Sequence, residues 1–374
     1  MAHDKEVLFY AVADLAPDRE KPITIFDRVA PVLKKADIVF GQLETVLSLH
    51  GSRLPQARHA VLTHPKAAAD MKAAGFNVIS CAGNHCMDWG REAFLDTLDV
   101  LAKAGISVIG AGANIREARK PAIFRTKGSN IALLAYNTIL PMAYWAEETR
   151  PGCTPLRAWT YYEQIEHDQP GTPCRIHTFP HKEDMKNMID DIKTAKSVSD
   201  VVIVSMHFGI HFIPAVLADY QKEMAYAAID AGADLILGHH AHILKGAEVY
   251  KGKNIFYSMC NFAVDLRMDK AHAESKSFRE IQKLNPDWIP DFEALYNFPT
   301  DSQKTLVVKC VIEEGVMKSV CFLPTYVDKK TAAPEILRAS DARFGQVVRY
   351  MEEISKNAGL TTKYVVNGDE VVLA

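Results

Sequence analysis

The chain has 374 residues, 48% of them hydrophobic and 24% charged, with 43 basic against 46 acidic side chains. The net charge of −3 lacks the basic excess of a chain that neutralises many nucleic-acid phosphates, so we expect no nucleic-acid partner. The seven cysteines are odd in number and irregularly spaced, which favours a reducing, cytoplasmic location over a disulfide framework.

Short β-rich runs alternate with helical patterns through most of the chain, which is typical of an α/β domain. The predicted strands are 6–13, 36–40, 76–80, 106–110, 130–136, 200–206, 233–237 and 254–259. The predicted helices are 65–74, 91–104, 182–198 and 219–231, and three of them end at Gly75, Gly105 or Gly232. Every apolar run is far shorter than the roughly 20 residues that cross a bilayer, so no membrane span is expected.

Two regions interrupt this alternation. Residues 141–181 hold six prolines and an aromatic cluster, and residues 266–300 mix aromatic side chains with acids and prolines. Both regions are too apolar for disordered linkers, and we expect them to be folded insertions over a cleft.

The end of the chain predicts antiparallel pairing. Residues 304–327 form two β-rich runs around a turn, which makes the sheets mixed. A predicted helix at 340–357 leads to a second hairpin at Asn367 and Gly368. We expect a main domain over 1–330 and a C-terminal extension over 331–374, which docks either on its own domain or on a second copy in a homodimer.

Polar side chains of the metal-ligand type follow five of the predicted strands. They are Asp14, Glu44, Asn84 with His85, His207, and His240 with His242. Taken singly, each has a simpler interpretation as a turn residue, a helix cap or a hydrogen-bonded loop histidine. Because the crevice of an open α/β sheet lies at the carboxyl ends of its strands, the five loops are expected to converge. His239, which directly precedes His240, is interpreted as a structural residue that fills space in the interior.

A converged Asp, Glu, Asn and His set without cysteine suits a catalytic site for one or two divalent ions, Mn²⁺, Zn²⁺ or Fe²⁺. Two such ions roughly 3.5–4 Å apart would make a bridging hydroxide nucleophilic at neutral pH, so hydrolysis is the expected reaction class. Next to this set, His85 is expected to act as a general acid that Asp88 orients.

Several motifs occur together in a fixed order. They are Asp14, QLE (42–44), GNHCMDWG (83–90), GAGANIREARKP (110–121), SMHFGIHF (205–212), the helix start at 221–225, AGADLILGHHAH (231–242) and GKNIFYSMCNF (252–262). This set resembles the CapA family of capsule and poly-γ-glutamate synthesis proteins, within the calcineurin-like metallophosphoesterase superfamily. The resemblance covers about residues 1–265, with strands continuing to about 327, and each motif alone is weak.

The resemblance implies a four-layer αββα sandwich with mixed sheets and a site at the strand ends. It implies metal ligands at Asp14, Glu44, Asn84, His207, His240 and His242, with His85 and Asp88 as the catalytic pair. The side chains expected to contact substrate are Gln42, Tyr144, Trp145, His211 and Asn261.

Three positions depart from the pattern of these relatives. Ala16 stands where the wider superfamily has a histidine, which weakens a second metal position. Gln42 replaces an asparagine, and His211 stands where the family usually has a glutamate, which removes one negative charge. The departures leave the substrate and the number of ions open.

Three functions are compatible with these observations. The first is a soluble metal-dependent hydrolase that acts on a phosphoester or an amide bond of a small or peptide-like anionic substrate, such as a γ-glutamyl compound. The second is a non-catalytic component of anionic-polymer synthesis, which would keep its function when Asn84 and His85 are replaced by alanine. The third is a protein with structural histidines that binds a ligand without metal, and metal analysis would distinguish it from the other two.

Overall fold

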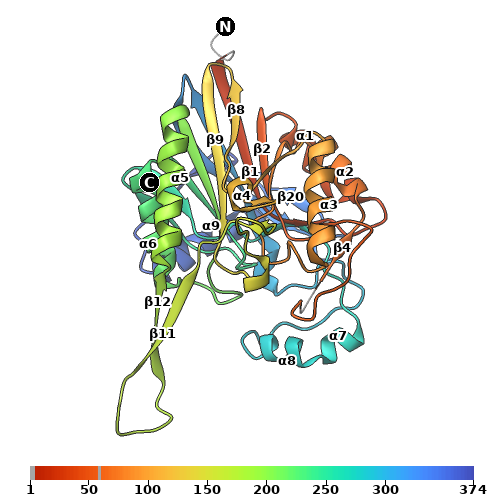
Figure 1. Ribbon diagram of the computed structural model, residues 1–374, viewed down its shortest axis with the longest axis vertical. Helices are drawn as coiled ribbons and strands as arrows, with labels where there is room; N and C mark the ends of the chain where they lie inside the picture. The colour runs from red at the N-terminus through yellow and green to blue at the C-terminus, as the bar shows by residue number, and fades with distance from the viewer. Residues whose placement is uncertain (1–4, 58–59) are drawn as a thin grey trace.

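The computed structural model describes residues 5–57 and 60–374, and its centre consists of two β-sheets packed face to face (Figure 1). Both sheets are mixed. The larger sheet contains β1 (Glu6–Ala16), β2 (Ile38–Leu43), β5 (Val78–Ser80), β6 (Ser107–Ile109), β17 (Asn261–Val264), β18 (Lys304–Glu313), β19 (Val316–Val327), β20 (Pro334–Ile336), β21 (Tyr364–Asn367) and β22 (Glu370–Leu373). The smaller sheet contains β8 (Ala122–Thr126), β9 (Ser129–Asn137), β13 (Val201–His207), β14 (Leu235–His239), β15 (Ala247–Tyr250) and β16 (Lys253–Phe256).

Helices cover the outer faces of this sandwich, with α5 and α6 on one side and α2 and α3 on the other (Figure 1). The helices are α1 (Ala30–Leu33), α2 (Lys66–Ala74), α3 (Gly90–Lys103), α4 (Ile115–Ala118), α5 (Lys182–Val198), α6 (Asp219–Ala231), α7 (Lys270–Glu274), α8 (Lys276–Gln282) and α9 (Ala342–Asn357). The 3₁₀ helices are η2 (Pro22–Phe26), η3 (Met142–Tyr144) and η4 (Thr300–Gln303). None of the described helices is long and apolar enough to cross a membrane.

Alternation along the strands explains the layers. In β13, Val201 and Ile203 pack toward the larger sheet, whereas Val202 and Val204 pack with Ile192 of α5 on the other face. Both faces of this strand are therefore buried, which accounts for its continuous apolar run. The predicted four-layer αββα sandwich with mixed sheets is confirmed, and α5 and α6 have the predicted bounds.

The C-terminal extension is part of the larger sheet. Strands β20 and β22 each pair with β19, and β21 pairs with β22 around the predicted turn. In this structure the extension packs on its own domain. The pairing of β18 with β19 is antiparallel, as predicted.

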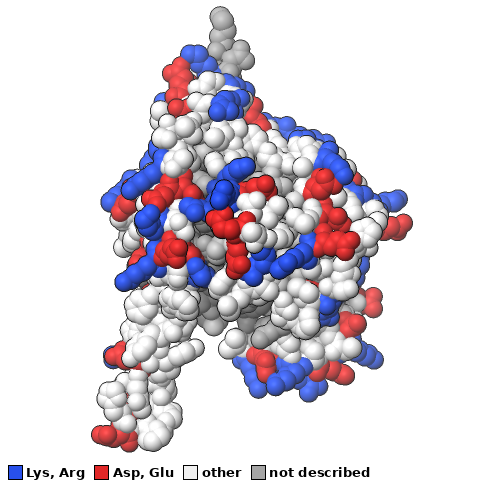
Figure 2. Space-filling model, in the orientation of Figure 1, with Lys and Arg blue, Asp and Glu red and all other residues white. Residues whose placement is uncertain are grey.

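Three two-stranded sheets complete the architecture: β3 (Val46–Leu47) with β4 (Leu62–Thr63), β7 (Ala111–Gly112) with β10 (Gly152–Cys153), and β11 (Ala158–Gln164) with β12 (Cys174–Pro180). The β11–β12 hairpin projects from the body, so only the first part of the 141–181 insertion lies beside the cleft (Figure 1). The hairpin surface is mostly uncharged, while the α7–α8 segment carries both signs of charge (Figure 2). On the hairpin, Trp159, Tyr161 and Tyr162 are exposed.

Candidate metal centre

The candidate metal centre lies between the two sheets, at the carboxyl ends of their parallel strands. On β13, His207 continues the parity of Val201 and Ile203, so its side chain faces the larger sheet. On the larger sheet, Asp14 pairs in register with Gln42 of β2. Asp14 and His207 therefore come close to each other from the two sheets. The sheet register therefore brings residues from distant parts of the chain to one buried place.

Asp14, Glu44 and His207 form a compact buried cluster. One potential ligand atom from each lies within 4.8 Å of the others. The Nδ1 atom of His207 is 3.2 Å from Glu44 Oε1, and its Nε2 atom donates to Asn84 Oδ1 at 2.7 Å. Two carboxylates and an imidazole this close form a donor set suited to a divalent cation.

The two histidines after β14, His240 and His242, also contact residues of this cluster. His240 Nδ1 donates to Asn84 Oδ1 at 3.2 Å, and its ring centroid is 5.0 Å from that of His207. His242 Nδ1 lies 3.6 Å from Asp14 Oδ2 and donates to Asn261 Oδ1 at 2.7 Å. Both histidines have positive φ angles, 87° for His240 and 54° for His242. This conformation is unfavourable for residues other than glycine and is often found at functional sites.

Several buried polar atoms of the cluster have no hydrogen-bond partner among the described residues. They are Asp14 Oδ2, Glu44 Oε2, His207 Nδ1 and His211 Nε2. An unpaired buried polar atom costs about 1–3 kcal/mol, more if it is charged. A bound cation would satisfy these oxygen and nitrogen atoms together, so the residues present fit a divalent metal.

Burial shifts the pKa values of the cluster strongly. It raises the pKa of Glu44 well above its usual value, and the nearby Asp14 carboxylate adds to this effect. Burial also lowers the pKa values of His207 and His240 well below the usual range, assisted by the neighbouring imidazoles. Histidines that stay neutral in this way are in the form that binds metals.

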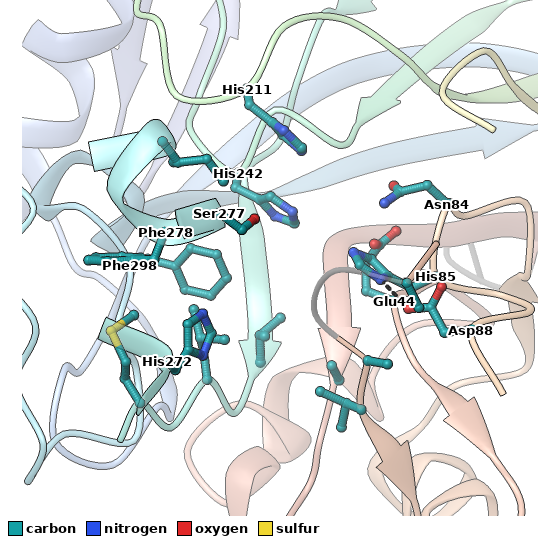
Figure 3. A pocket seen from close by; sticks show the side chains of 18 of the residues that line it. Glu44, Asn84, His85, Asp88, His211, His242, His272, Ser277, Phe278 and Phe298 are labelled. Carbon is teal, nitrogen blue, oxygen red and sulfur yellow. Dashed lines mark hydrogen bonds and ion pairs between the residues drawn. The ribbon is translucent and has the colours of Figure 1, made fainter. Parts of the chain in front are cut away.

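His85 lies at the cavity side of this cluster and belongs to a hydrogen-bonded chain (Figure 3). Its Nδ1 atom donates to Asp88 Oδ2 at 2.6 Å, and the Tyr144 hydroxyl donates to Asp88 Oδ1 at 3.0 Å. The Asp88 carboxylate thereby fixes the orientation of the imidazole and leaves its Nε2 atom available to a ligand in the cavity.

A cavity of about 790 Å³ opens beside the cluster and has two chemically different ends. We call the residues Glu44, Asn84, His85, His211 and His242 the ligand end, and the residues Phe212, Phe278, Trp288 and Phe298 the aromatic end. In Figure 3, Glu44, Asn84, His85 and Asp88 lie across the cavity from Phe278 and Phe298. A volume of this size accommodates a small organic molecule, in addition to a group held at the metal.

The structure brings the expected ligands and the catalytic pair together, and it separates three of the expected substrate contacts from the cavity. Tyr144 and His211 are among its lining residues. Trp145 is not, because its indole Nε1 donates to Leu140 O and its ring packs against the Arg157 guanidinium. The structure thus has Trp145 outside the cavity lining, and a substrate contact at this residue stays a prediction.

The two buried amides beside the cluster also lie outside the cavity lining. Gln42 donates to Glu44 Oε1 at 3.4 Å, and Asn261 accepts from His242. The Nδ2 atom of Asn261 in turn donates to the Tyr296 hydroxyl at 2.9 Å. Both amides contact expected metal ligands on the side away from the cavity lining, where they can orient them. A substrate contact at Gln42 or Asn261 stays a prediction.

His239 is the residue that the sequence interpretation missed. It is fully buried, and its Nδ1 atom donates to Asp14 Oδ1 at 3.0 Å. It ends β14 with the same parity as Leu235 and Leu237, which face the larger sheet. That parity is a signal in the sequence, but using it requires knowing that the strand reaches residue 239.

Comparisons with known proteins agree with this arrangement of motifs. Residues 8–266 match the model of a family described as bacterial capsule synthesis protein PGA_cap. The chain is 30% identical over 244 residues to the PGA biosynthesis protein CapA of Bacillus subtilis, which covers 65% of this chain and 57% of that protein. It is 29% identical over 245 residues to the capsule biosynthesis protein CapA of Bacillus anthracis, which covers 64% and 54%. The chain thus spans little more than half the length of these relatives.

The chain is also similar to a solved structure, at a lower sequence identity than to the two relatives above. The calcineurin-like phosphoesterase YfkN from Bacillus subtilis superposes with a TM-score of 0.38 and 13% sequence identity. The superposition covers 94% of this chain and 97% of that chain.

Proposed function

The chain belongs to the PGA_cap family of bacterial capsule synthesis proteins, and from that premise we propose that it is a metal-dependent hydrolase of a phosphoester or amide bond in a small anionic substrate. One observation carries the proposal: buried ligand atoms of Asp14, Glu44 and His207, which have no hydrogen-bond partner in the described part of the chain, lie beside an oriented His85–Asp88 pair. A structural role alone would not explain why carboxylate and imidazole atoms remain unpaired in the interior.

The residues that would hold a divalent ion are Asp14, Glu44, Asn84, His207, His240 and His242. A bound ion would act as a Lewis acid and activate water near neutral pH. Ala16 lines the cavity at the position of the superfamily histidine, so a second ion would have one ligand fewer. The proposal is therefore for one ion or two, of the Mn²⁺, Zn²⁺ or Fe²⁺ type.

Side chains of this protein would supply the proton transfer, the orientation of the acid and the exclusion of water. His85 would give a proton from Nε2 to the leaving group, because its Nδ1 atom is engaged by Asp88. Asp88 would stabilise the protonated ring, and Tyr144 would hold the second carboxylate oxygen of Asp88. His211 contacts His240 and His242 at ring-centroid distances of 3.8 and 5.3 Å and would exclude water from this side of the site.

A second candidate function is a non-catalytic role in the synthesis of an anionic polymer. Two relatives are named as biosynthesis proteins of PGA or of a capsule, and the missing superfamily histidine at position 16 is the observation in this chain that supports such a role. In that case the buried cluster would serve to hold the fold or a partner.

The test uses the full chain, purified without chelator. It is treated with a chelator, dialysed, and given Mn²⁺ or Zn²⁺, and hydrolysis is followed with phenyl phosphate, a phosphodiester, γ-glutamyl anilide and a cyclic amide. We expect turnover of at least one substrate, its loss on chelation and its return with metal. A protein that binds metal but hydrolyses none of these compounds favours the non-catalytic role, and one that binds no metal contradicts both metal-based accounts.

A further inference from the structure

The aromatic end of the cavity is made by four rings that pack on one another. The ring centroid of Trp288 is 5.0 Å from that of Phe212, 5.1 Å from that of Phe278 and 6.3 Å from that of Phe298. The Trp288 Nε1 atom donates to Asn297 O at 2.9 Å, so the polar atom of the indole is already satisfied. What this end presents to the cavity is therefore apolar ring surface.

This aromatic surface continues directly into the ligand end. The His242 ring lies 5.2 Å from Phe298 and 5.7 Å from Phe212, measured between centroids. Phe212 follows His211 in the chain and has a positive φ of 55°, a backbone conformation that is unfavourable for a residue other than glycine. A group attached to the reacting centre of a substrate at His242 would thus meet aromatic side chains first.

The charges that line the cavity do not suit a long polyanion. Among the described lining residues, the carboxylates of Glu44, Asp88, Asp265 and Asp269 accompany one guanidinium, that of Arg53. Asp265 is paired with Arg19 at 2.5 Å, and Asp269 caps α7 by accepting from His272 N. Beyond the metal ligands, a chain of glutamyl carboxylates would meet rings and further acids, both of which disfavour it.

We propose that the aromatic end is a subsite for a flat, uncharged ring carried by the substrate, next to the bond that is cleaved at the ligand end. This inference rests on the proposed function and narrows it, because it selects aryl-bearing phosphoesters or anilides over poly-γ-glutamate. The anionic group of the substrate lies at the metal ligands, and its ring packs against Trp288 and Phe298.

The test compares three stable phosphonates on the Mn²⁺-loaded full chain by calorimetry, of which the phenyl and carboxyethyl compounds are similar in size. Methylphosphonate supplies the anion alone, phenylphosphonate adds a ring, and 2-carboxyethylphosphonate adds a second carboxylate. Burial and stacking of a phenyl ring predict that phenylphosphonate binds at least about tenfold more tightly than either of the others. This comparison within the wild-type protein does not depend on whether any variant folds.

Variants then locate the subsite. Trp288→Leu is expected to reduce the phenyl preference to about threefold or less while Mn²⁺ still binds, since the ring contact is lost and the metal ligands are intact. Trp159→Leu is the matched control, because Trp159 is 59% exposed on the projecting hairpin, outside the cavity lining. It should leave the preference unchanged.

Two outcomes would overturn the inference without touching the proposed function. They are Mn²⁺ binding with no phenyl preference, and a preference that Trp288→Leu and Trp159→Leu affect equally. Tighter binding of 2-carboxyethylphosphonate than of phenylphosphonate would likewise overturn it and would favour a polyanionic substrate. Failure of Mn²⁺, Zn²⁺ and Fe²⁺ alike to bind would overturn the proposed function and the inference with it.

Discussion

The two ends of the cavity are built by different kinds of structure. The ligand end comes from residues at or just after strands of the two central sheets, where register and parity fix each side chain. The aromatic end comes mainly from residues 278–298, which lie in α8 and the irregular segment that follows it. In many proteins a rigid scaffold carries the chemistry while connecting segments set specificity, and this cavity has the same division.

The two ends also differ in how well their polar groups are satisfied. At the ligand end, Asp14 Oδ2 and Glu44 Oε2 are buried and have no hydrogen-bond partner among the described residues. At the aromatic end, Trp288 Nε1 and Asn297 Nδ2 both donate to backbone carbonyls. The unpaired atoms mark the end where a ligand is needed to complete the structure, and the satisfied end is a preformed surface.

The largest expected effect separates chemistry from metal binding at the ligand end. Replacing His85 with alanine should lower kcat by about 10²–10⁴, because a positioned general acid contributes that much. Mn²⁺ content and thermal stability should stay close to wild type, since the His85 side chain is 25% exposed and lies at the cavity side of the cluster. Steady-state kinetics and metal analysis measure both quantities. The control is His167→Ala on the exposed tip of the hairpin, and a kcat within twofold of wild type in His85→Ala would contradict the assignment.

The next effect concerns the residues behind the ligands. Asn261→Ala removes the partner of His242 Nδ1 and should weaken Mn²⁺ binding by about 10–100-fold, the usual cost of losing such a positioning contact. Calorimetric titration with Mn²⁺ measures the change. Asn357→Ala, at the exposed end of α9, is the control. Equal affinities in the two variants would show that His242 does not need this contact.

A third prediction addresses the loop that joins the two ends. Lys245 is fully buried and donates to the carbonyl oxygens of Ile213 and Val216, just after Phe212. Burial lowers its pKa to about 7, far below its value in an unfolded chain. Its charge therefore penalises the folded state most below pH 7, and the penalty declines as the pH rises from 7 toward 10.5.

The corresponding measurement is urea unfolding of wild type and Lys245→Met at pH 7.5 and 9. As the pH rises, the unfolding free energy of wild type should increase relative to that of the variant by at most about 1.4 kcal/mol per pH unit. The reason is that Lys245 stays protonated in the unfolded wild-type chain but loses its proton in the folded one. A difference between the two proteins that stays constant with pH would contradict the lowered pKa.

The smallest expected effect tests the hydrogen bond behind the general acid. Tyr144→Phe keeps the ring but removes the donor to Asp88 Oδ1, and should lower kcat about threefold to tenfold. Tyr162→Phe on the exposed hairpin is the matched control. If kcat in Tyr144→Phe equals that of the control, Asp88 does not depend on this bond to orient His85.

The contrast between the two ends also explains what the sequence could predict. Apolar runs that end in Asp14, His207 and His242 indicate buried strands with polar ends, and the sheets then bring those ends together. The arrangement of 266–300 depends on contacts such as Trp288 with Asn297, which no local periodicity encodes. The position of Trp145 could not be predicted for the same reason, because its contact with Arg157 depends on the fold of a loop.

His239 was missed for a different reason. Near the end of β14, the side chains of His239, His240 and His242 can each point to the larger sheet or belong to the turn. A shift of the strand boundary by one residue changes which of them points to the sheet. The structure ends β14 at His239, which directs this side chain to Asp14 and leaves His240 and His242 to the turn.

The central claim is that Asp14, Glu44 and His207 hold a divalent cation, and metal stoichiometry tests it most directly. The full chain and its His207→Ala and His167→Ala variants are stripped with chelator, equilibrated with Mn²⁺ and assayed for bound metal. We predict one or two ions per chain in wild type and His167→Ala, and a loss of at least one ion in His207→Ala. Equal metal content in all three proteins, or none in any of them, would contradict the claim.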